Sequence, residues 1–474
     1  MRARRALMDG GTGHGAAYDL AVVGAGSGGF AAAIRGAELG ARVALIGHGA
    51  IGGTCVNIGC VPSKTLIRAM QGVNGARAAG RFAGIGAKAR LTDWAALVAQ
   101  KDELVAGLRQ AKYVDVLAAY PGITAIAGPA RLVEGGVAVD GAAIRAGKIV
   151  LATGARPALP DIAGLSEVEP LTSTTAMELE RLPRSLLVIG GGDIGAELAQ
   201  MFARAGARVT LVCRSRLLPR AEPEIGTALT DVFAAEGIAV RAGASYEWIR
   251  RTGHGVTLAL VGGEVIEAER VLSAVGRRPN TDGLGLAEAG VALAPGGGVR
   301  IDDRLRTTRP GVYAVGDVTG RHMHVYMAAY AGRLAADNAL EGADHRYDAA
   351  AMPEVTFTDP QAASVGLTER QARDQGLDVR TTVLPLEHVA RALAARDTRG
   401  LIKLVAADER LLGAHILAPE GGEAIQTAAL AIKHGMTVGA LAETIFPYLT
   451  TVEGLKLAAQ SFDKDVAKLS CCAG

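Results

Sequence analysis

The 474-residue sequence has few cysteines, no long apolar run and little net charge. Its five cysteines are too few for a disulfide scaffold. No stretch of about 18 or more apolar residues predicts a transmembrane helix, and the basic, glycine-rich first residues lack the apolar core of a signal peptide. The formal net charge of +2 argues against a nucleic-acid or anionic membrane surface. We therefore expect a cytoplasmic protein.

Glycine, by contrast, is abundant: 63 of 474 residues, against roughly 7% in ordinary domains. Two copies of a G-x-G-x-x-G turn each follow an apolar, strand-like run and open a helix-like one. The copies comprise strand 19–24, Gly24, Gly26, Gly29, helix 31–39 and strand 42–46, then strand 185–189, Gly190, Gly192, Gly195, helix 196–205 and strand 208–212. This pattern predicts an α/β fold with two Rossmann-like dinucleotide-binding units, although each match alone could be an ordinary glycine-rich turn.

The second strand of each copy ends where an acidic residue would hold a ribose hydroxyl. In the second copy Cys213 stands there, followed by Arg214 and Arg216. The two guanidinium groups favour a 2′-phosphate and therefore NADPH over NADH, unless they are solvated surface arginines. We interpret Cys213 as a packing residue. In the first copy Gly47 and His48 occupy the position, which departs from the expected acid.

Cys55 and Cys60 lie directly after the first unit, in the run GGTCVNIGCVPSK. Two cysteines at this spacing could be metal ligands, but structural zinc requires four ligands. The alternative is a redox pair at a helix N-terminus, where the thiol pKa is lowered and Pro62 suits the first turn. The run resembles the flavin disulfide reductases, as do residues 152–154, the run ending at Asp317 and Glu197 after the second glycine turn. The resemblance covers about residues 18–474.

That resemblance implies a homodimer that uses FAD and NADPH. It implies a disordered arm at 1–17, an FAD-binding domain at 18–160, an NADPH-binding domain at 161–280, a central domain completing the FAD fold at 281–350, and a C-terminal α+β interface domain at 351–474. It also implies that FAD contacts Gly24, Gly26, Gly29, Gly49, Thr54, Lys64, Ala130, Asp317 and Val325. Lys64 and Glu197 would form an ion pair beside the flavin, because a desolvated lysine needs such a partner.

The C-terminal region indicates the substrate. Many family members use a histidine as the base for thiol exchange, but Tyr448 stands at that position, while the following acid is kept as Glu453. Tyrosine, with a pKa near 10, is a poor base at pH 7. The chain then ends with adjacent Cys471 and Cys472, two soft ligands for a thiophilic cation, unless they are an incidental exposed pair.

Together these features resemble the branch of the family that reduces Hg(II) to Hg(0). The resemblance implies that Cys471 and Cys472 of one subunit take Hg(II) from small thiols. They would pass it to Cys55 and Cys60 of the other subunit, where Cys60 would contact the flavin. Tyr448 and Tyr113 would be active-site tyrosines, although Tyr113 could also be an ordinary helix residue.

Two other functions stay open from the sequence alone. The first is an NADPH-dependent reductase of a small disulfide. The second is a non-catalytic, thiol-based mercury-sequestering protein, against which the intact NADPH fingerprint argues because sequestration needs no hydride donor.

Overall fold

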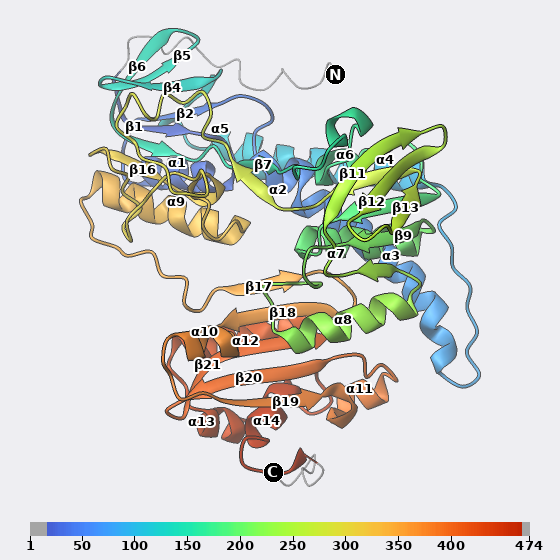
Figure 1. Cartoon of the computed structure of the whole chain (residues 1–474). Helices are drawn as coiled ribbons and strands as arrows, with labels where there is room; N and C mark the ends of the chain where they lie inside the picture. The colour runs from blue at the N-terminus through green and yellow to red at the C-terminus, as the bar shows by residue number, and fades with distance from the viewer. Residues whose placement is uncertain (1–16, 467–474) are drawn as a thin grey trace. The chain divides into compact units, whose positions relative to one another are not determined.

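The computed structural model describes residues 17–466, and Figure 1 shows the chain. These residues belong to two compact units, each assembled from separate stretches. The first unit contains the chain up to Ser63, Ala96–Ala158 and Arg277–Asp348. The second contains Lys64–Ala95, Leu159–Gly276 and the chain from Ala349 onward. All but the last residue of the expected arm at 1–17 lies outside the described residues, and so do Cys471 and Cys472.

The first unit is built on a largely parallel sheet. Its strands run in the order β3-β2-β1-β6-β5-β4, and β16 pairs with β6. The strands are β1 (Ala17–Val23), β2 (Val43–Gly47), β3 (Ile123–Ala127), β4 (Ala130–Val133), β5 (Gly136–Val139), β6 (Ala142–Leu151) and β16 (Val312–Ala314); β7 (Ala155–Pro157) pairs separately with β15 (Arg277–Pro279). β1 and β2 are almost entirely buried, as the continuous apolar runs of a parallel sheet require.

Two helices pack closely in this unit, α1 (Ser27–Glu38) and α9 (Val325–Leu340). Glycines allow the approach, because a Cβ atom at Gly332 would overlap the carbonyl oxygen of Gly28. The unit also contains α2 (Gly53–Ile58), the start of α3 (Cys60–Arg77), most of α4 (Trp94–Arg109), the π-helical turn η2 (Gln110–Val114), α5 (Asp115–Ala118) and η4 (Gly316–Thr319). The region expected to complete the FAD fold thus supplies β16 and α9.

The second unit begins with another parallel sheet, in the order β10-β9-β8-β14. The strands are β8 (Ser185–Ile189), β9 (Arg208–Val212), β10 (Ala239–Arg241) and β14 (Arg270–Ser273), with α7 (Asp193–Ala205) and α8 (Pro223–Ala235) as the main helices. An antiparallel sheet of β11 (Tyr246–Thr252), β12 (Gly255–Leu260) and β13 (Val265–Ala268) accompanies it. Short helical turns complete this part: η1 (Ala78–Arg81), η3 (Leu165–Val168) and α6 (Ser173–Ala176).

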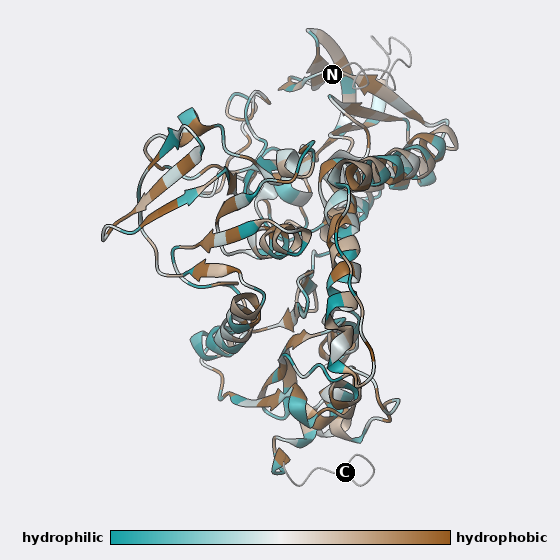
Figure 2. Cartoon of the chain, turned by 90° about the vertical axis from the view of Figure 1, so that its right-hand side faces the viewer, coloured by the Kyte–Doolittle hydropathy of each residue, from teal (hydrophilic) through white to brown (hydrophobic). Residues whose placement is uncertain are grey.

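The C-terminal part of the second unit is an antiparallel sheet with helices, in the order β17-β18-β21-β20-β19. Its strands are β17 (Pro353–Thr356), β18 (Gln361–Gly366), β19 (Arg380–Pro385), β20 (Leu401–Ala407) and β21 (Arg410–Ala418). Its helices are α10 (Glu369–Asp374), η5 (Leu386–His388), α11 (Ala390–Ala394), α12 (Gly421–Lys433), α13 (Val438–Glu443) and α14 (Glu453–Gln460). Figure 2 shows hydrophilic and hydrophobic residues mixed along the helices of the chain. In α12 the buried residues Ala424, Ile425 and Ala428 recur at helical spacing and form one face.

The predicted α/β class is confirmed, but both fingerprint helices begin earlier than predicted. α1 begins at Ser27 and α7 at Asp193, directly after the second glycine of each motif. The third glycine is therefore part of the first helical turn. Within the described residues, every helix is too short or too polar to cross a membrane.

Candidate functional site

The cysteine segment is hydrogen-bonded to the first glycine turn. The Gly52 amide donates to the Ala25 carbonyl at 2.9 Å, and Gly26 and Gly52 form a β-bridge. The two backbones approach so closely that a Cβ atom at Gly53 would lie 2.6 Å from Gly26 Cα. Cys55 lies in α2 and Cys60 is the first residue of α3, and both side chains are half-buried. The fold therefore brings the phosphate-binding turn and the thiol pair together.

The first glycine turn has the form that a dinucleotide such as FAD requires. A Cβ atom at Gly29 would overlap the Gly24 carbonyl oxygen, so helix and strand can pack this closely only with glycine. The buried Nε of Arg277 has no hydrogen-bond partner among the described residues, and it lies 3.5 Å from Asp317 Oδ2. Burial raises the pKa of Asp317, and the charge of Arg277 opposes the shift. A glycine cradle and an unsatisfied buried guanidinium nitrogen fit an anionic dinucleotide.

Arg277 also connects this region to the cysteine helix. Its guanidinium donates to the Ala155 carbonyl and, at 3.5 Å, to Thr54 Oγ1, one residue before Cys55. Of the other predicted FAD contacts, Ala130 begins β4 and Val325 begins α9, while Gly49 follows β2 with φ of 102°. These placements do not test their contact with FAD, which stays a prediction.

Tyr113 lies against Gly52, at the start of the segment that carries Cys55. Its ring is 4.9 Å from that of Phe30 in an edge-to-face arrangement, and a Cβ atom at Gly52 would meet it at 3.1 Å. Burial raises the pKa of Tyr113; the charges of Cys55 and Cys60 raise it further, and a hydrogen bond with Ser27 opposes the shift. Tyr113 lies in the π-helical turn η2, a local irregularity that is frequent at functional sites.

Asn57 and Arg109 support the cysteine segment, and the sequence analysis missed both. The Asn57 amide donates to the carbonyls of Ile51 at 2.9 Å and Gly53 at 2.8 Å, and Arg109 donates to its oxygen at 3.0 Å. A polar amide between the two cysteines of the sequence motif was the available signal. The bonds tie the helix position after Cys55 to the backbone before it.

The second glycine turn repeats the first. A Cβ atom at Gly195 would overlap the Gly190 carbonyl oxygen, whereas Gly192 at the N-terminus of α7 faces open space. Such a helix N-terminus suits a pyrophosphate. Cys213 is buried, and burial raises the pKa of its thiol, in keeping with a packing role.

The structure separates the roles of Arg214 and Arg216. The Arg216 guanidinium donates to four backbone carbonyls of its own loop, those of Leu218, Pro219, Ala221 and Glu222. Those bonds hold the loop and occupy most of its donors. Arg214 is exposed. Of the two arginines predicted to contact a 2′-phosphate, only Arg214 therefore remains a candidate.

Lys64 and Glu197 form the ion pair expected from the resemblance. Lys64 Nζ lies 2.6 Å from Glu197 Oε2, and the Glu197 side chain is only 6% exposed. Lys64 lies in α3, four residues after Cys60, and Glu197 lies one turn into α7. The ion pair therefore ties the helix that begins with Cys60 to α7, with the Lys64 side chain one turn after Cys60.

Tyr448 lies in an exposed loop of the C-terminal part. Its side chain is 52% exposed, and the neighbouring Ile445 is 95% exposed. Glu453 is buried, and its Oε2 accepts a hydrogen bond from the Leu449 amide at 3.1 Å. Glu453 thus fixes the turn that follows Tyr448. Cys471 and Cys472 lie outside the described residues, and their predicted role stays a prediction.

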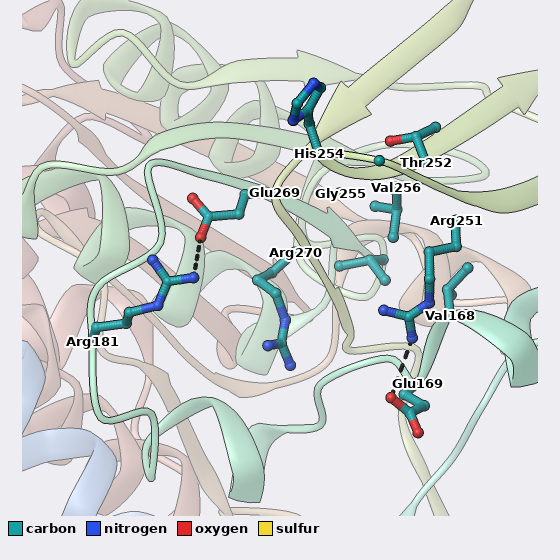
Figure 3. Close-up of a pocket in the computed structure, with 12 residues that line it drawn as sticks. Val168, Glu169, Arg181, Arg251, Thr252, His254, Gly255, Val256, Glu269 and Arg270 are labelled. Carbon is teal, nitrogen blue, oxygen red and sulfur yellow. Dashed lines mark hydrogen bonds and ion pairs between the residues drawn. The ribbon is translucent and has the colours of Figure 1, made fainter.

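A cavity of about 410 Å³ lies away from these residues, on the antiparallel sheet of the second unit. Figure 3 shows that Arg181 pairs with Glu269, at 3.0 Å, and Arg251 with Glu169, at 3.2 Å. Arg270 also lines it. None of the predicted site residues contributes to this cavity.

Comparison with known proteins defines the class. The model of the pyridine nucleotide-disulphide oxidoreductases matches residues 18–332, and the model of their dimerisation domain matches residues 352–459. The chain belongs to this family, and its cofactors are FAD and NADPH.

Individual relatives of the chain carry a more specific name than the family. The chain is 49% identical to the mercuric reductase of Streptomyces lividans, over 96% of this chain and 98% of the relative. It is 46% identical to the mercuric reductase of Lysinibacillus sphaericus, over 96% of this chain and 85% of the relative. Among solved structures it is similar to a Cu(II) complex of the flavoprotein disulfide reductase RclA of Escherichia coli, with a TM-score of 0.84, 30% identity, and coverage of 94% and 99% of the two chains.

Proposed function

We propose that this chain is a mercuric reductase, which reduces thiol-bound Hg(II) to Hg(0) at Cys55 and Cys60. The observation that carries the proposal is the half-buried pair Cys55 and Cys60 in a segment bonded to the first glycine turn, in a chain whose histidine position is filled by Tyr448. The near full-length identity to mercuric reductases supports it. When bound, NADPH and FAD supply the two electrons that Hg(II) takes up.

The chain's own residues suit the substrate. Two thiolates are soft ligands, which prefer a soft cation such as Hg(II). Cys60 lies at the N-terminus of α3, where the helix dipole favours negative charge on its sulfur. Because burial raises the pKa of Tyr113, its phenol stays protonated at neutral pH and offers a hydrogen bond to a thiolate rather than a competing charge. Asn57 keeps the backbone that carries Cys55 in place.

The second part of the proposal concerns delivery and assembly. The loop around Tyr448 exposes three large side chains, Ile445, Tyr448 and Leu449, which a second copy of this chain would cover. The matched dimerisation domain supports such a homodimer. Cys471 and Cys472 of one subunit would take Hg(II) from small thiols and hand it to Cys55 and Cys60 of the other by ligand exchange, with Tyr448 beside the path.

The test is NADPH oxidation by the FAD-loaded protein with Hg(II) in excess thiol, followed together with the release of volatile mercury. We expect oxidation that depends on mercury, and loss of it in Cys55→Ser and Cys60→Ser. Cys213→Ser is the matched control, because Cys213 is buried at the end of β9, outside the segment of Cys55 and Cys60, and serine keeps its size.

A small disulfide in place of Hg(II) separates the competing function. NADPH oxidation with the disulfide but not with Hg(II) would show a disulfide reductase. Binding of mercury without NADPH oxidation would show a sequestering protein. Either result would overturn the proposal. For the tail, Cys471→Ala/Cys472→Ala should slow turnover when mercury arrives on a bulky thiol, and equal rates would remove the delivery step.

A further inference from the structure

A short segment of the C-terminal part runs along the nucleotide-binding helix α7. Thr356 Oγ1 donates to Asp193 Oδ1 at 2.8 Å, and the Phe357 amide donates to Glu197 Oε1, also at 2.8 Å. One turn further, Gln200 exchanges two hydrogen bonds with the backbone of Asp359, at 2.8 and 2.9 Å.

The same segment ends at a buried ion pair. One terminal nitrogen of Arg204, NH1, lies 2.9 Å from Asp359 Oδ2, and the Arg204 side chain is 4% exposed. The four residues of α7 that hold the segment recur at helical spacing and lie on one face of the helix. We call these four side chains the α7 clamp: Asp193, Glu197, Gln200 and Arg204.

Phe357 has two contacts with the ion pair in the middle of the clamp. Its amide holds one oxygen of Glu197, while Lys64 pairs with the other. Its ring lies over the ammonium group of Lys64, with Nζ 4.8 Å from the ring centroid. An aromatic face attracts a cation in this geometry and adds to the pull of the carboxylate.

We propose that Phe357 is a positioning residue for Lys64 and thereby sets the electrostatic potential beside the flavin. The inference rests on the proposed function, in which FAD passes electrons to the thiol pair, and on the expectation from the family resemblance that Lys64, one turn after Cys60, lies beside the flavin. With the carboxylate on one side and the ring on another, the ammonium group is confined to a narrow range of orientations. A fixed cation near a flavin favours the reduced state, which is the more negative one.

The predicted effect follows from the strength of the contact. The contact is half-buried, and the carboxylate of Glu197 remains beside Lys64 when the ring is removed, so only part of the confinement is lost. Removing the ring should therefore weaken the preference for the reduced flavin by about three- to tenfold. For a two-electron couple a tenfold change corresponds to about 30 mV.

The experiment measures the two-electron potential of the protein-bound flavin in Phe357→Leu, without mercury. We expect a lower potential at unchanged flavin content and unchanged thermal stability, and recovery in Phe357→Tyr, which keeps an aromatic face. Phe462→Leu is the matched control, because Arg380 lies 5.4 Å from that ring at an exposed site.

The outcomes are distinct from those of the mercury assay. An unchanged potential in Phe357→Leu, or an equal fall in Phe357→Tyr, would overturn the positioning role even if the protein reduces mercury. If the protein reduces no mercury but the potential shifts as expected, the positioning role stands and only the substrate is wrong. Variants that bind no flavin are replaced by Phe357→Met, which keeps the volume without the aromatic face.

Discussion

Replacing Lys403 should destabilise the second unit more than any loss of an exposed ion pair. Lys403 lies in β20 with a side chain only 2% exposed. Its ammonium nitrogen lies 3.0 Å from Glu222, 2.8 Å from Glu224 and 2.9 Å from Glu369. Burial alone would lower the pKa of Lys403, but these hydrogen bonds outweigh it and hold the pKa above the ordinary value. Lys403 therefore stays charged at neutral pH.

The magnitude depends on which carboxylate is left behind. In Lys403→Met, Glu224 and Glu369 are 38% and 29% exposed and can turn to water, whereas Glu222 is 3% exposed and cannot. A buried charge without its partner costs about 3–5 kcal/mol. That loss lowers the melting temperature of a unit of about 250 residues by roughly 6–10 °C, and the second unit is slightly larger, so we expect a fall of about this size.

Thermal and urea denaturation followed by circular dichroism would measure the loss. Arg373→Ala is the matched control, because Arg373 also binds Glu369 but is 57% exposed; its pair is worth at most about 1 kcal/mol. The double variant Lys403→Met/Glu222→Gln should recover much of the stability. If Lys403→Met were no worse than Arg373→Ala, or if the double variant showed no recovery, the assignment of the cost to Glu222 would be refuted.

The pH range in which this difference holds follows from the pKa shifts. The pKa of Lys403 is raised, so its stabilisation is complete below about pH 10.4 and is lost as the pH rises beyond that. The pKa of Glu369 is lowered by its bonds to Lys403 and Arg373, so its stabilisation is complete above about pH 4.3 and is lost in stronger acid. The destabilisation by Lys403→Met should be nearly constant between these limits.

Three further predictions concern single residues. Burial lowers the pKa of His415, so the free energy of unfolding should fall as the pH drops below about 6.5, by up to about 1.4 kcal/mol per pH unit. In denaturation curves His415→Gln should flatten this pH dependence. The control His434→Gln, at an exposed position, should leave it unchanged. Arg214→Ala should raise the KM for NADPH by roughly 10- to 150-fold and leave that for NADH unchanged, because a charged hydrogen bond is worth about 1.5–3 kcal/mol. Arg216→Ala should instead lower the melting temperature, because four carbonyls lose their donor. Equal KM changes for both nucleotides would contradict the 2′-phosphate contact. Gly29→Ala should abolish flavin retention, because the added methyl group overlaps the Gly24 carbonyl oxygen. Flavin absorbance of the purified protein measures this. The control Gly72→Ala in α3 has open space around the added methyl group and should retain flavin fully.

Local motifs carried most of what could be predicted from the sequence. The glycine turns and the cysteine pair each occupy a few consecutive residues, so their strand–turn–helix context was readable, and the α/β class follows from it. Tyr113 was harder, since it follows the cysteines by more than 50 residues and only the fold brings it to Phe30. The sequence does not distinguish an arginine that binds backbone carbonyls, such as Arg216, from an arginine that is available to bind a phosphate.

Apart from the Lys64–Glu197 pair, which the family resemblance implied, long-range polar contacts could not be predicted. Phe357 and Glu197 are separated by 160 residues, and Lys403 and Glu222 by 181. Neither pair has a periodicity or a motif, because each depends on where distant segments cross. These contacts hold the nucleotide-binding helix and the C-terminal sheet together, so the sequence analysis identified the elements but not the bonds between them.

The α7 clamp limits how this chain can be divided for protein engineering. A nucleotide-binding segment expressed alone or exchanged for that of a relative would expose Gln200 and Arg204, which are now 3% and 4% exposed and bonded to Asp359. A graft that keeps the host's residues 356–359 but changes the face of α7 would bury polar groups without partners. Coenzyme preference is therefore best altered by exchanging α7 together with the segment that it holds, or by substitutions confined to the loop of Arg214.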